Sequence, residues 1–215
     1  MMSHFPPCLS TDSLQDNLFH FVGIGGCGMS GLARLLTQLG GDVQGTDCVE
    51  SAVTKSLSED GITISMLQDG SMISTDINLI VHSAAISPDH PEIRRGDELG
   101  IPIVTYAQML GFVQTHHTGV CIAGTHGKST TVSMLSAILL DIGFDPSFIV
   151  GANCSQIGGS SRVGTATIPE GPFLGNKGVL ISESCEFNRS FHDHVPIFGL
   201  INNIEEDHLD YYPTL

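Results

Sequence analysis

The stretch Ile122-Ala-Gly-Thr-His-Gly-Lys-Ser-Thr-Thr131 places a glycine-rich turn, a lysine and then hydroxyl side chains between two apolar segments. Residues 119–123 before the turn are typical of a β-strand, and residues 132–140 after it are typical of a helix. A loop in this position turns backbone N–H groups and a helix N-terminus towards phosphate. The stretch therefore predicts a site for a nucleoside triphosphate in an α/β domain of the P-loop type.

Each residue type in this loop has an expected task. Glycine allows the sharp turn, Lys128 brings a cation to the β- and γ-phosphates, and Ser129 offers a hydroxyl to Mg²⁺. The predicted ATP-binding residues are Gly124, Thr125, His126, Gly127, Lys128, Ser129 and Thr130. The loop is shorter than the usual P-loop, since Ile122 stands where its first glycine is expected. A purely structural turn is the alternative, but a turn does not require lysine followed by three hydroxyl residues.

A second glycine-rich loop lies well upstream of the first. The run His20-Phe-Val-Gly-Ile-Gly-Gly-Cys-Gly-Met-Ser-Gly31 contains Gly-x-Gly-x-x-Gly twice, between a predicted strand at 19–24 and a predicted helix at 29–39. Asp47 follows the strand-like run 42–46, at the distance where a nucleotide-binding βαβ unit contacts a ribose or base. Two loops predict two phosphate-bearing ligands. An NAD-dependent dehydrogenase, the first alternative, would need only one.

Strand-like and helix-like segments alternate along the chain from the first glycine loop onward. Such alternation predicts parallel, Rossmann-like sheets with helices on their faces. Further strands are predicted at 62–65, 77–82, 101–105, 147–151, 178–182 and 197–202, and further helices at 51–59, 91–99 and 106–114. Polar loops rich in glycine or proline are expected at 158–161 and 165–175.

The segment 115–118 is the predicted junction between two domains. The expected order is a poorly ordered lead-in at 1–16, a Rossmann-like domain at 17–115 and the first part of a P-loop-type ATP-binding domain at 119–215. Leu215 follows the lysine loop too soon for a complete P-loop domain with its base pocket. The chain is therefore expected to be a fragment.

Composition excludes some classes of partner. The chain has 23 acidic and 8 basic residues, a net charge of −15, which disfavours nonspecific binding to nucleic acid or to an anionic membrane. No apolar run reaches the length of about 18 residues that a spanning helix needs. Six cysteines without a C-x-x-C pair predict reduced, mostly buried thiols in a cytoplasmic protein.

Two polar clusters follow predicted strands after the lysine loop. Glu183 follows the apolar run 178–181 at the end of a predicted strand, where a carboxylate can coordinate Mg²⁺ beside a triphosphate. His208 lies among carboxylates after the strand 197–202, where an imidazole can ligate a metal or shuttle a proton. The alternatives are a solvated glutamate and a surface ion-pair partner.

Taken together, these strings resemble the Mur ligase family. The resemblance rests on residues 20–31, 81–86 with His90-Pro91-Glu92, 124–131, 183–191 and 203–212. The shortened P-loop is the family's own form. Near Glu183 the family string is E-x-D-E-[YF]-D-x-S-F, and here Cys185 and Asn188 replace two aspartates. Those two positions are where the chain departs from the family pattern.

The resemblance implies a domain for a UDP-sugar, a central ATPase domain and a C-terminal domain that this chain lacks. The UDP-sugar-binding residues carried over by position are Gly25, Gly26, Cys27, Gly28, Met29, Ser30, Asp47, His82, Ser83 and Ala84. The implied catalytic residues are Lys128, Glu183 and His208, and the implied Mg²⁺ ligands are Ser129, Glu183 and His208.

The reaction that the resemblance implies is the ATP-dependent joining of L-alanine to UDP-N-acetylmuramate in peptidoglycan precursor synthesis. It would pass through an acyl phosphate, and the 215-residue chain alone is expected to be inactive. A Mur-type ligase that adds a recycled peptide to the same UDP-sugar is the nearest alternative, and the Gly-Gly-x-Gly-Met-Ser-Gly form of the first loop favours L-alanine. The remaining alternative function is a nucleotide sensor without catalytic activity.

Overall fold

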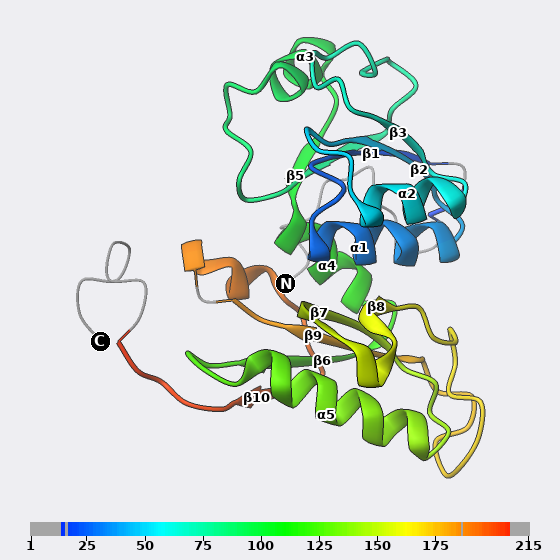
Figure 1. Ribbon diagram of the computed structural model, residues 1–215. Coiled ribbons are helices and arrows are strands. Elements are labelled where there is room, and N and C mark those ends of the chain that lie inside the picture. Colours follow the sequence, from blue (N-terminus) through cyan, green and yellow to red (C-terminus); the bar gives the residue numbers. More distant parts are fainter. Residues whose placement is uncertain (1–13, 16, 186, 207–215) are drawn as a thin grey trace. The chain divides into compact units, whose positions relative to one another are not determined.

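The computed structural model describes residues 14–15, 17–185 and 187–206. The chain divides into two compact units between Met109 and Leu110. Each unit is an α/β structure around a five-stranded sheet (Figure 1). The predicted fold class, a Rossmann-like unit followed by an α/β unit with a glycine–lysine loop, is confirmed.

The first unit holds an all-parallel sheet in the order β3-β2-β1-β4-β5. The strands are β1 (Leu18–Val22), β2 (Asp42–Thr46), β3 (Thr63–Ser65), β4 (Leu79–His82) and β5 (Ile103–Thr105). Strand order reverses between β1 and β4, and ligands bind beyond the carboxyl ends of strands at such a point. The glycine loop after β1 lies there.

Helices cover the two faces of the first sheet. They are α1 (Cys27–Gln38), α2 (Ala52–Glu59) and α3 (Pro91–Leu99), followed by α4 (Tyr106–Gln114), in which the two units meet along the chain. Figure 1 shows α1 and α2 side by side on one face of the sheet and α3 beyond the other. Because both faces are covered, most residues of the central strands are apolar and buried, among them Phe19, Phe21, Leu79 and Ile80, and His20 on β1 is a buried polar exception.

The second unit holds a sheet in the order β10-β6-β9-β7-β8. The strands are β6 (Thr118–Ala123), β7 (Ser147–Cys154), β8 (Gly159–Arg162), β9 (Val179–Glu183) and β10 (Phe198–Ile201), with 3₁₀ turns η1 (Ser155–Ile157) and η2 (Phe187–Asp193). All neighbours are parallel except β7 and β8. The core lies between the sheet and helix α5 (Lys128–Asp141), where Ile122, Val132, Phe148 and Ile181 pack together.

The loop predicted at 158–161 is wrong, because most of it belongs to β8. Gly158 and Gly159 have φ values of 87° and 140°, which reverse the chain so that β8 pairs antiparallel with β7. Arg162 then forms an ion pair with Asp145 beside the start of β7. The strand has no apolar alternation, since it lies at a sheet edge and its residues are all half-buried.

The prediction of mostly buried cysteines is also wrong for the described part of the chain. Of the five cysteines there, all free thiols, Cys121 alone is buried, and Cys27, Cys48 and Cys185 are exposed. The exposed three lie in the turns or the helix start that follow β1, β2 and β9. The apolar strands beside them are buried, but the side chains at these ends reach solvent.

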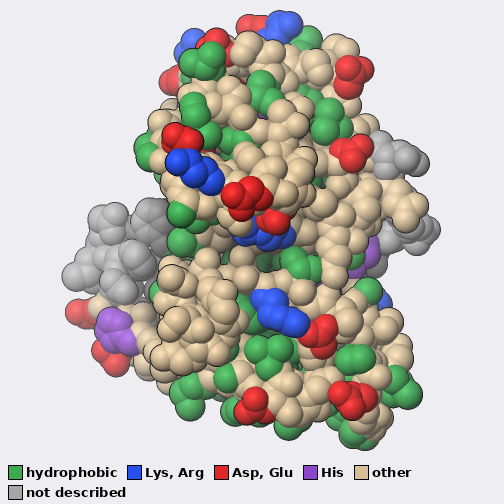
Figure 2. Space-filling model, turned by 45° about the vertical axis from the view of Figure 1, so that its right-hand side comes forward, with side chains coloured by type: hydrophobic (Ala, Val, Ile, Leu, Met, Phe, Trp, Pro, Cys, Tyr) green, Lys and Arg blue, Asp and Glu red, His purple; other side chains and the backbone are tan. Residues whose placement is uncertain are grey.

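Two further properties of the described residues concern surface charge and helix length. On the described residues of the face in Figure 2, Lys and Arg side chains are few and dispersed among Asp and Glu, without a continuous basic patch. None of the helices in residues 14–206 has the length and apolar character needed to cross a membrane. The cytoplasmic location stays a prediction.

Candidate functional site

The lysine loop lies between β6 and α5 at the carboxyl edge of the second sheet. Gly127 has φ 79° and precedes Lys128, the first residue of α5, and as the N-cap residue it offers no side-chain cap. In α2 and α3 the first turn is capped by the side chains of Ser51 and His90. An N-cap residue without a side chain leaves space for an anion beside the start of a helix.

Lys128 holds its charge inside this loop. Its ammonium donates hydrogen bonds to the carbonyl oxygens of Gly124 and Thr125, the latter at 3.2 Å. Ser129 follows in the first turn of α5 and is half-buried, whereas Thr130 is exposed. The predicted ATP-binding residues therefore form one continuous turn with a cation over its backbone.

Two asparagines after β10 fix the loop, and the sequence analysis assigned them no role. The side chain of Asn203 accepts a hydrogen bond from His126 N–H at 2.9 Å and donates one to His126 O at 3.2 Å. Asn202 Nδ2 donates to Thr131 Oγ1 at 3.1 Å. The sequence does contain a signal for this role, because two asparagines directly follow a strand that ends at the sheet edge where the loop lies.

Glu183 lies at the same edge, at the end of β9. It pairs in register with Ile122, two residues before the loop begins. Its Oε1 accepts a hydrogen bond of 2.7 Å from the N–H of Gly151 on β7. The structure thus brings together the loop, Ser129 at the start of α5 and Glu183, whereas His208 lies outside the described residues.

A buried polar cluster lies in the second unit, away from the loop. The Nε2 of Gln114 is 3.0 Å from Ser182 Oγ, 3.1 Å from Cys121 Sγ and 3.0 Å from His194 Nδ1, and its Oε1 accepts from Val195 N–H at 2.8 Å. No sequence pattern marked this glutamine. It joins α4 to β6 and β9, the strands that lead to the lysine loop and to Glu183.

The cysteine and histidine of this cluster do not form a nucleophile. Cys121 Sγ and His194 Nδ1 are 3.6 Å apart. Burial raises the pKa of the Cys121 thiol, and burial lowers the pKa of His194 to about 4. Both groups are therefore neutral at pH 7, whereas a reactive pair needs a thiolate beside an imidazolium.

The glycine loop of the first unit is held by residues at the end of β2. The carbonyl of Thr46 accepts hydrogen bonds from Gly23 N–H at 2.9 Å and Ile24 N–H at 3.0 Å. Asp47 Oδ2 accepts one from Gly25 N–H at 2.8 Å. Asp47, which was expected to contact a ribose or base, therefore also fixes the backbone of the loop.

The other predicted UDP-sugar residues lie around this loop. Gly26 is the N-cap of α1 and offers no side-chain cap. Cys27 is exposed, but the side chains of Met29 and Ser30 are buried, so these two can meet a ligand only through their backbone. A Cβ on Gly28 would lie 2.8 Å from the ring of Tyr106.

The segment His82 to Ala84 lies beside the loop at the end of β4. His82 pairs with Val22 on β1, and Ser83 N–H donates to the carbonyl of Val22 at 3.3 Å. His82 and Ser83 are half-buried and Ala84 is exposed. The ends of β1, β2 and β4 thus bring all the predicted UDP-sugar residues to one edge of the first sheet.

Two family models match the chain. The model described as the Mur ligase family, catalytic domain, matches residues 18–117, and the Mur ligase middle domain matches residues 122–215. Together they account for nearly all of the described chain.

Curated relatives and solved structures agree with these models. A UDP-N-acetylmuramate–L-alanine ligase of Lachnospira eligens is 42% identical to this chain, and the match covers 91% of this chain and 40% of the ligase. The same ligase of Clostridium kluyveri is 40% identical, and the match covers 96% of this chain and 43% of the ligase. The structure of a UDP-N-acetylmuramate:L-alanyl-gamma-D-glutamyl-meso-diaminopimelate ligase from Neisseria meningitides has a TM-score of 0.81 at 28% identity, covering 91% of this chain and 63% of that one. The structure of a UDP-N-acetylmuramate-alanine ligase from Thermotoga maritima has a TM-score of 0.74 at 28% identity, and the match covers 92% of this chain and 44% of that one. The chain spans about two fifths of the length of these curated relatives.

Proposed function

The chain belongs to the Mur ligase family, and from this premise we propose that it serves the ATP-dependent ligation of L-alanine to UDP-N-acetylmuramate in peptidoglycan precursor synthesis. The first unit would bind the UDP-sugar and the second unit ATP. One observation carries the proposal: each unit has a glycine loop at the carboxyl edge of its sheet, followed by a helix whose N-cap residue is a glycine. Two separate phosphate-bearing substrates match this arrangement.

The proposed reaction has two steps. A carboxylate oxygen of UDP-N-acetylmuramate attacks the γ-phosphorus of ATP, the bond to the bridging oxygen breaks, and ADP leaves behind an acyl phosphate. The amine nitrogen of L-alanine then attacks the acyl carbon, phosphate leaves with the bonding electron pair, and the nitrogen loses a proton. Such chemistry depends on positioning and charge neutralisation more than on a covalent nucleophile. Lys128 would neutralise charge on the phosphates of ATP.

The residues present fit Mg²⁺ as the cofactor. Mg²⁺ prefers a few hard oxygen ligands and keeps water or phosphate oxygens as the others. Ser129 offers a hydroxyl and Glu183 a carboxylate that is held in place by Gly151 N–H. When bound, Mg²⁺ would offset the charge that develops on the phosphoryl oxygens. The role of His208 as a further ligand stays a prediction.

The alternative acceptor, a peptide, has one observation in its favour. The Neisseria ligase, whose name includes a tripeptide, has a higher TM-score than the Thermotoga alanine ligase, 0.81 against 0.74. Both are 28% identical to this chain, whereas the curated alanine ligases are 40% and 42% identical. Sequence similarity therefore favours L-alanine.

The NAD-dependent dehydrogenase is the weaker alternative. It gives the lysine loop no role, because a dehydrogenase needs one dinucleotide site and the first glycine loop would supply it. Tight NADH binding by the chain would revive this alternative.

Phosphate release tests the proposed function. The full-length gene product is given ATP, Mg²⁺ and UDP-N-acetylmuramate, and L-alanine is compared with the L-alanyl-γ-D-glutamyl-meso-diaminopimelate tripeptide. We expect phosphate release to depend on L-alanine. Release with the tripeptide alone would assign the chain to the peptide ligases, and release with neither would overturn the proposal.

A further inference from the structure

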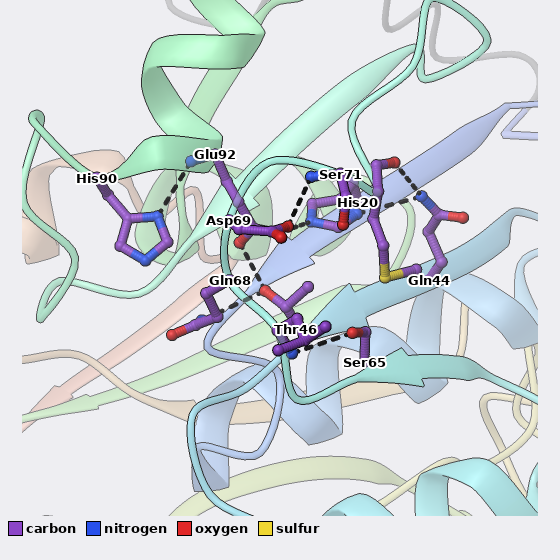
Figure 3. A network of polar contacts seen from close by, with 11 residues as sticks. His20, Gln44, Thr46, Ser65, Gln68, Asp69, Ser71, His90 and Glu92 are labelled. Carbon is purple, nitrogen blue, oxygen red and sulfur yellow. Dashed lines mark hydrogen bonds and ion pairs between the residues drawn. The ribbon is translucent and has the colours of Figure 1, made fainter.

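Thr46 connects the glycine loop to a buried polar network in the first unit (Figure 3). Its backbone carbonyl accepts from Gly23 N–H and Ile24 N–H, and the next residue, Asp47, accepts from Gly25 N–H. Three successive amides of the loop thus depend on the last residue of β2 and its neighbour. The position of Thr46 therefore sets the position of the loop.

The side chain of Thr46 is fixed from the opposite direction. Its Oγ1 donates a hydrogen bond of 2.6 Å to Glu92 Oε2 and accepts one of 3.3 Å from Gln68 Nε2. Glu92 belongs to the first turn of α3, where His90 Nδ1 accepts from the N–H of Glu92. The hydroxyl of Thr46 can donate only one hydrogen bond, and this bond goes to Glu92.

Glu92 is completely buried. Its side chain is 0% exposed, as is that of His20, whose Nε2 lies 3.3 Å from Glu92 Oε1. His20 Nδ1 faces the amide of Gln44 at 3.2 Å, and that amide also donates to Met72 O. Neither His20 Nε2 nor Glu92 Oε1 has a hydrogen-bond partner among the described residues, so the contact between these two buried atoms lacks hydrogen-bond geometry.

A buried carboxylate of this kind needs an explanation. Replacing buried ionic groups by apolar residues of similar volume is often neutral or stabilising, so such a group is weak evidence for a role in stability alone. Thr46 is the buried residue to which Glu92 is bonded most closely, and it touches the loop through its backbone. Neither residue was among those expected to bind the UDP-sugar.

We propose that Glu92 is a positioning residue that acts through Thr46 to hold the glycine loop in the conformation that receives the UDP-sugar diphosphate. The inference rests on the proposed function for the identity of the ligand. Glu92 fixes the hydroxyl of Thr46, Thr46 and Asp47 fix the amides of residues 23–25, and the first turn of α1 stays open to the anion. Preorganised donors bind a phosphate more tightly than donors that must first be ordered.

Calorimetry on the 215-residue chain tests this with UDP-N-acetylmuramate as the probe. Thr46→Val keeps the shape of the side chain and the backbone carbonyl but removes the hydroxyl, and Thr46→Ser restores it. Thr37→Val, on the exposed side of α1, makes the same chemical change where Oγ1 donates to Ala33 O. We expect Thr46→Val to raise the Kd about fivefold to tenfold, and the other two variants to stay within about twofold.

The binding stoichiometry from calorimetry distinguishes a positioning role of Glu92 and Thr46 from a role in folding. A merely structural role would lower the number of competent molecules and the melting temperature but leave the Kd of the folded molecules unchanged. An unchanged Kd for Thr46→Val would overturn the inference. If the wild type does not bind the UDP-sugar, the proposed function fails, and the inference is then decided by amide exchange.

Hydrogen exchange of the loop amides provides that second measurement. We expect the N–H groups of Ile24 and Gly25 to exchange faster in Thr46→Val than in wild type, with Thr37→Val unchanged. If Thr46→Val does not fold, Glu92→Leu replaces it, because it removes the acceptor of the Thr46 hydroxyl and puts an apolar side chain of similar size in place of the buried carboxylate. Exchange at wild-type rates in the variant that folds would overturn the inference.

Discussion

The carboxylate of Glu183 accepts a hydrogen bond of 2.7 Å from the backbone N–H of Gly151, which ties the end of β9 to β7. Only Oε1 takes part, and Oε2 has no hydrogen-bond partner within the described ranges 14–15, 17–185 and 187–206. One oxygen therefore orients the side chain, and the other can meet a cation at the edge where the lysine loop lies.

Variants of Glu183 provide the first test of the proposed metal site. In the full-length enzyme, Glu183→Gln keeps an acceptor for Gly151 N–H but removes the charge, and Glu183→Ala removes both. We expect each change to lower the rate of phosphate release about 100-fold, because charge neutralisation at the phosphates is lost. The Kd for UDP-N-acetylmuramate should not change. Near-normal turnover of either variant would remove Glu183 from the site.

Gly28 is expected to be indispensable for binding the UDP-sugar. Gly28→Val should abolish calorimetric binding of UDP-N-acetylmuramate, because a side chain there blocks backbone approach to the diphosphate. The structure adds a second reason, since a Cβ at this position would lie 2.8 Å from Tyr106 Cζ and Oη. The double variant Gly28→Val, Tyr106→Ala separates the two causes. Wild-type affinity in this double variant would show that the clash with Tyr106 was the whole effect.

Asn203 should matter for ATP and not for the UDP-sugar. Asn203→Ala removes both hydrogen bonds to the backbone of His126. We expect the Kd for a nonhydrolysable ATP analogue to rise about tenfold, since the loop loses its preorganisation. The matched control is Asn78→Ala, whose Oδ1 accepts from Leu18 N–H at 2.8 Å in the first unit. Equal ATP affinity in the Asn203 variant and the control would contradict the assignment.

His194 should make the protein less stable in acid. Burial lowers the pKa of its folded form from 6.5 to about 4. The unfolded chain therefore binds more protons between these pH values, and the free energy of unfolding falls as the pH drops from 6.5 towards 4. Burial also lowers the pKa of His117, which acts in the same direction.

The variant His194→Gln isolates this contribution. Urea unfolding at pH 7 and pH 4.5 should show wild type losing about 2 kcal/mol more than His194→Gln, because the other acid-sensitive groups are common to both chains. Equal losses in the two proteins would show that the His194 imidazole is accessible to protons in the folded state.

The 215-residue chain should bind ligands without turning them over. It spans about two fifths of the length of the curated ligases that it matches. A reactant that is no longer held loses alignment worth on the order of 7–11 kcal/mol. With ATP, Mg²⁺, UDP-N-acetylmuramate and L-alanine, we expect phosphate release far below that of the Lachnospira eligens enzyme. Comparable rates would show that the 215 residues contain every group that catalysis requires.

The fold was largely predictable from local patterns. Glycine loops between apolar runs, Pro91 at the start of α3 and the alternation of strand and helix gave most elements to within a few residues. The apolar parallel strands were recognisable because burial on both faces makes their sequences nearly continuous. The strand β8 was missed, since an edge strand of polar residues carries no such pattern.

The candidate sites were predictable only where chemistry and position coincide along the chain. By itself the sequence determined the two glycine loops, Lys128, Ser129 and the acid at the end of β9, because each follows a strand that the apolar pattern reveals. Only the tertiary structure decided which distant side chains hold those loops. Asn203 reaches His126, Asp47 reaches Gly25, and Glu92 reaches Thr46 through contacts 22 to 77 residues apart in sequence. Local sequence periodicity does not predict such contacts, because they form only when parallel strands bring their carboxyl ends to one edge of the sheet.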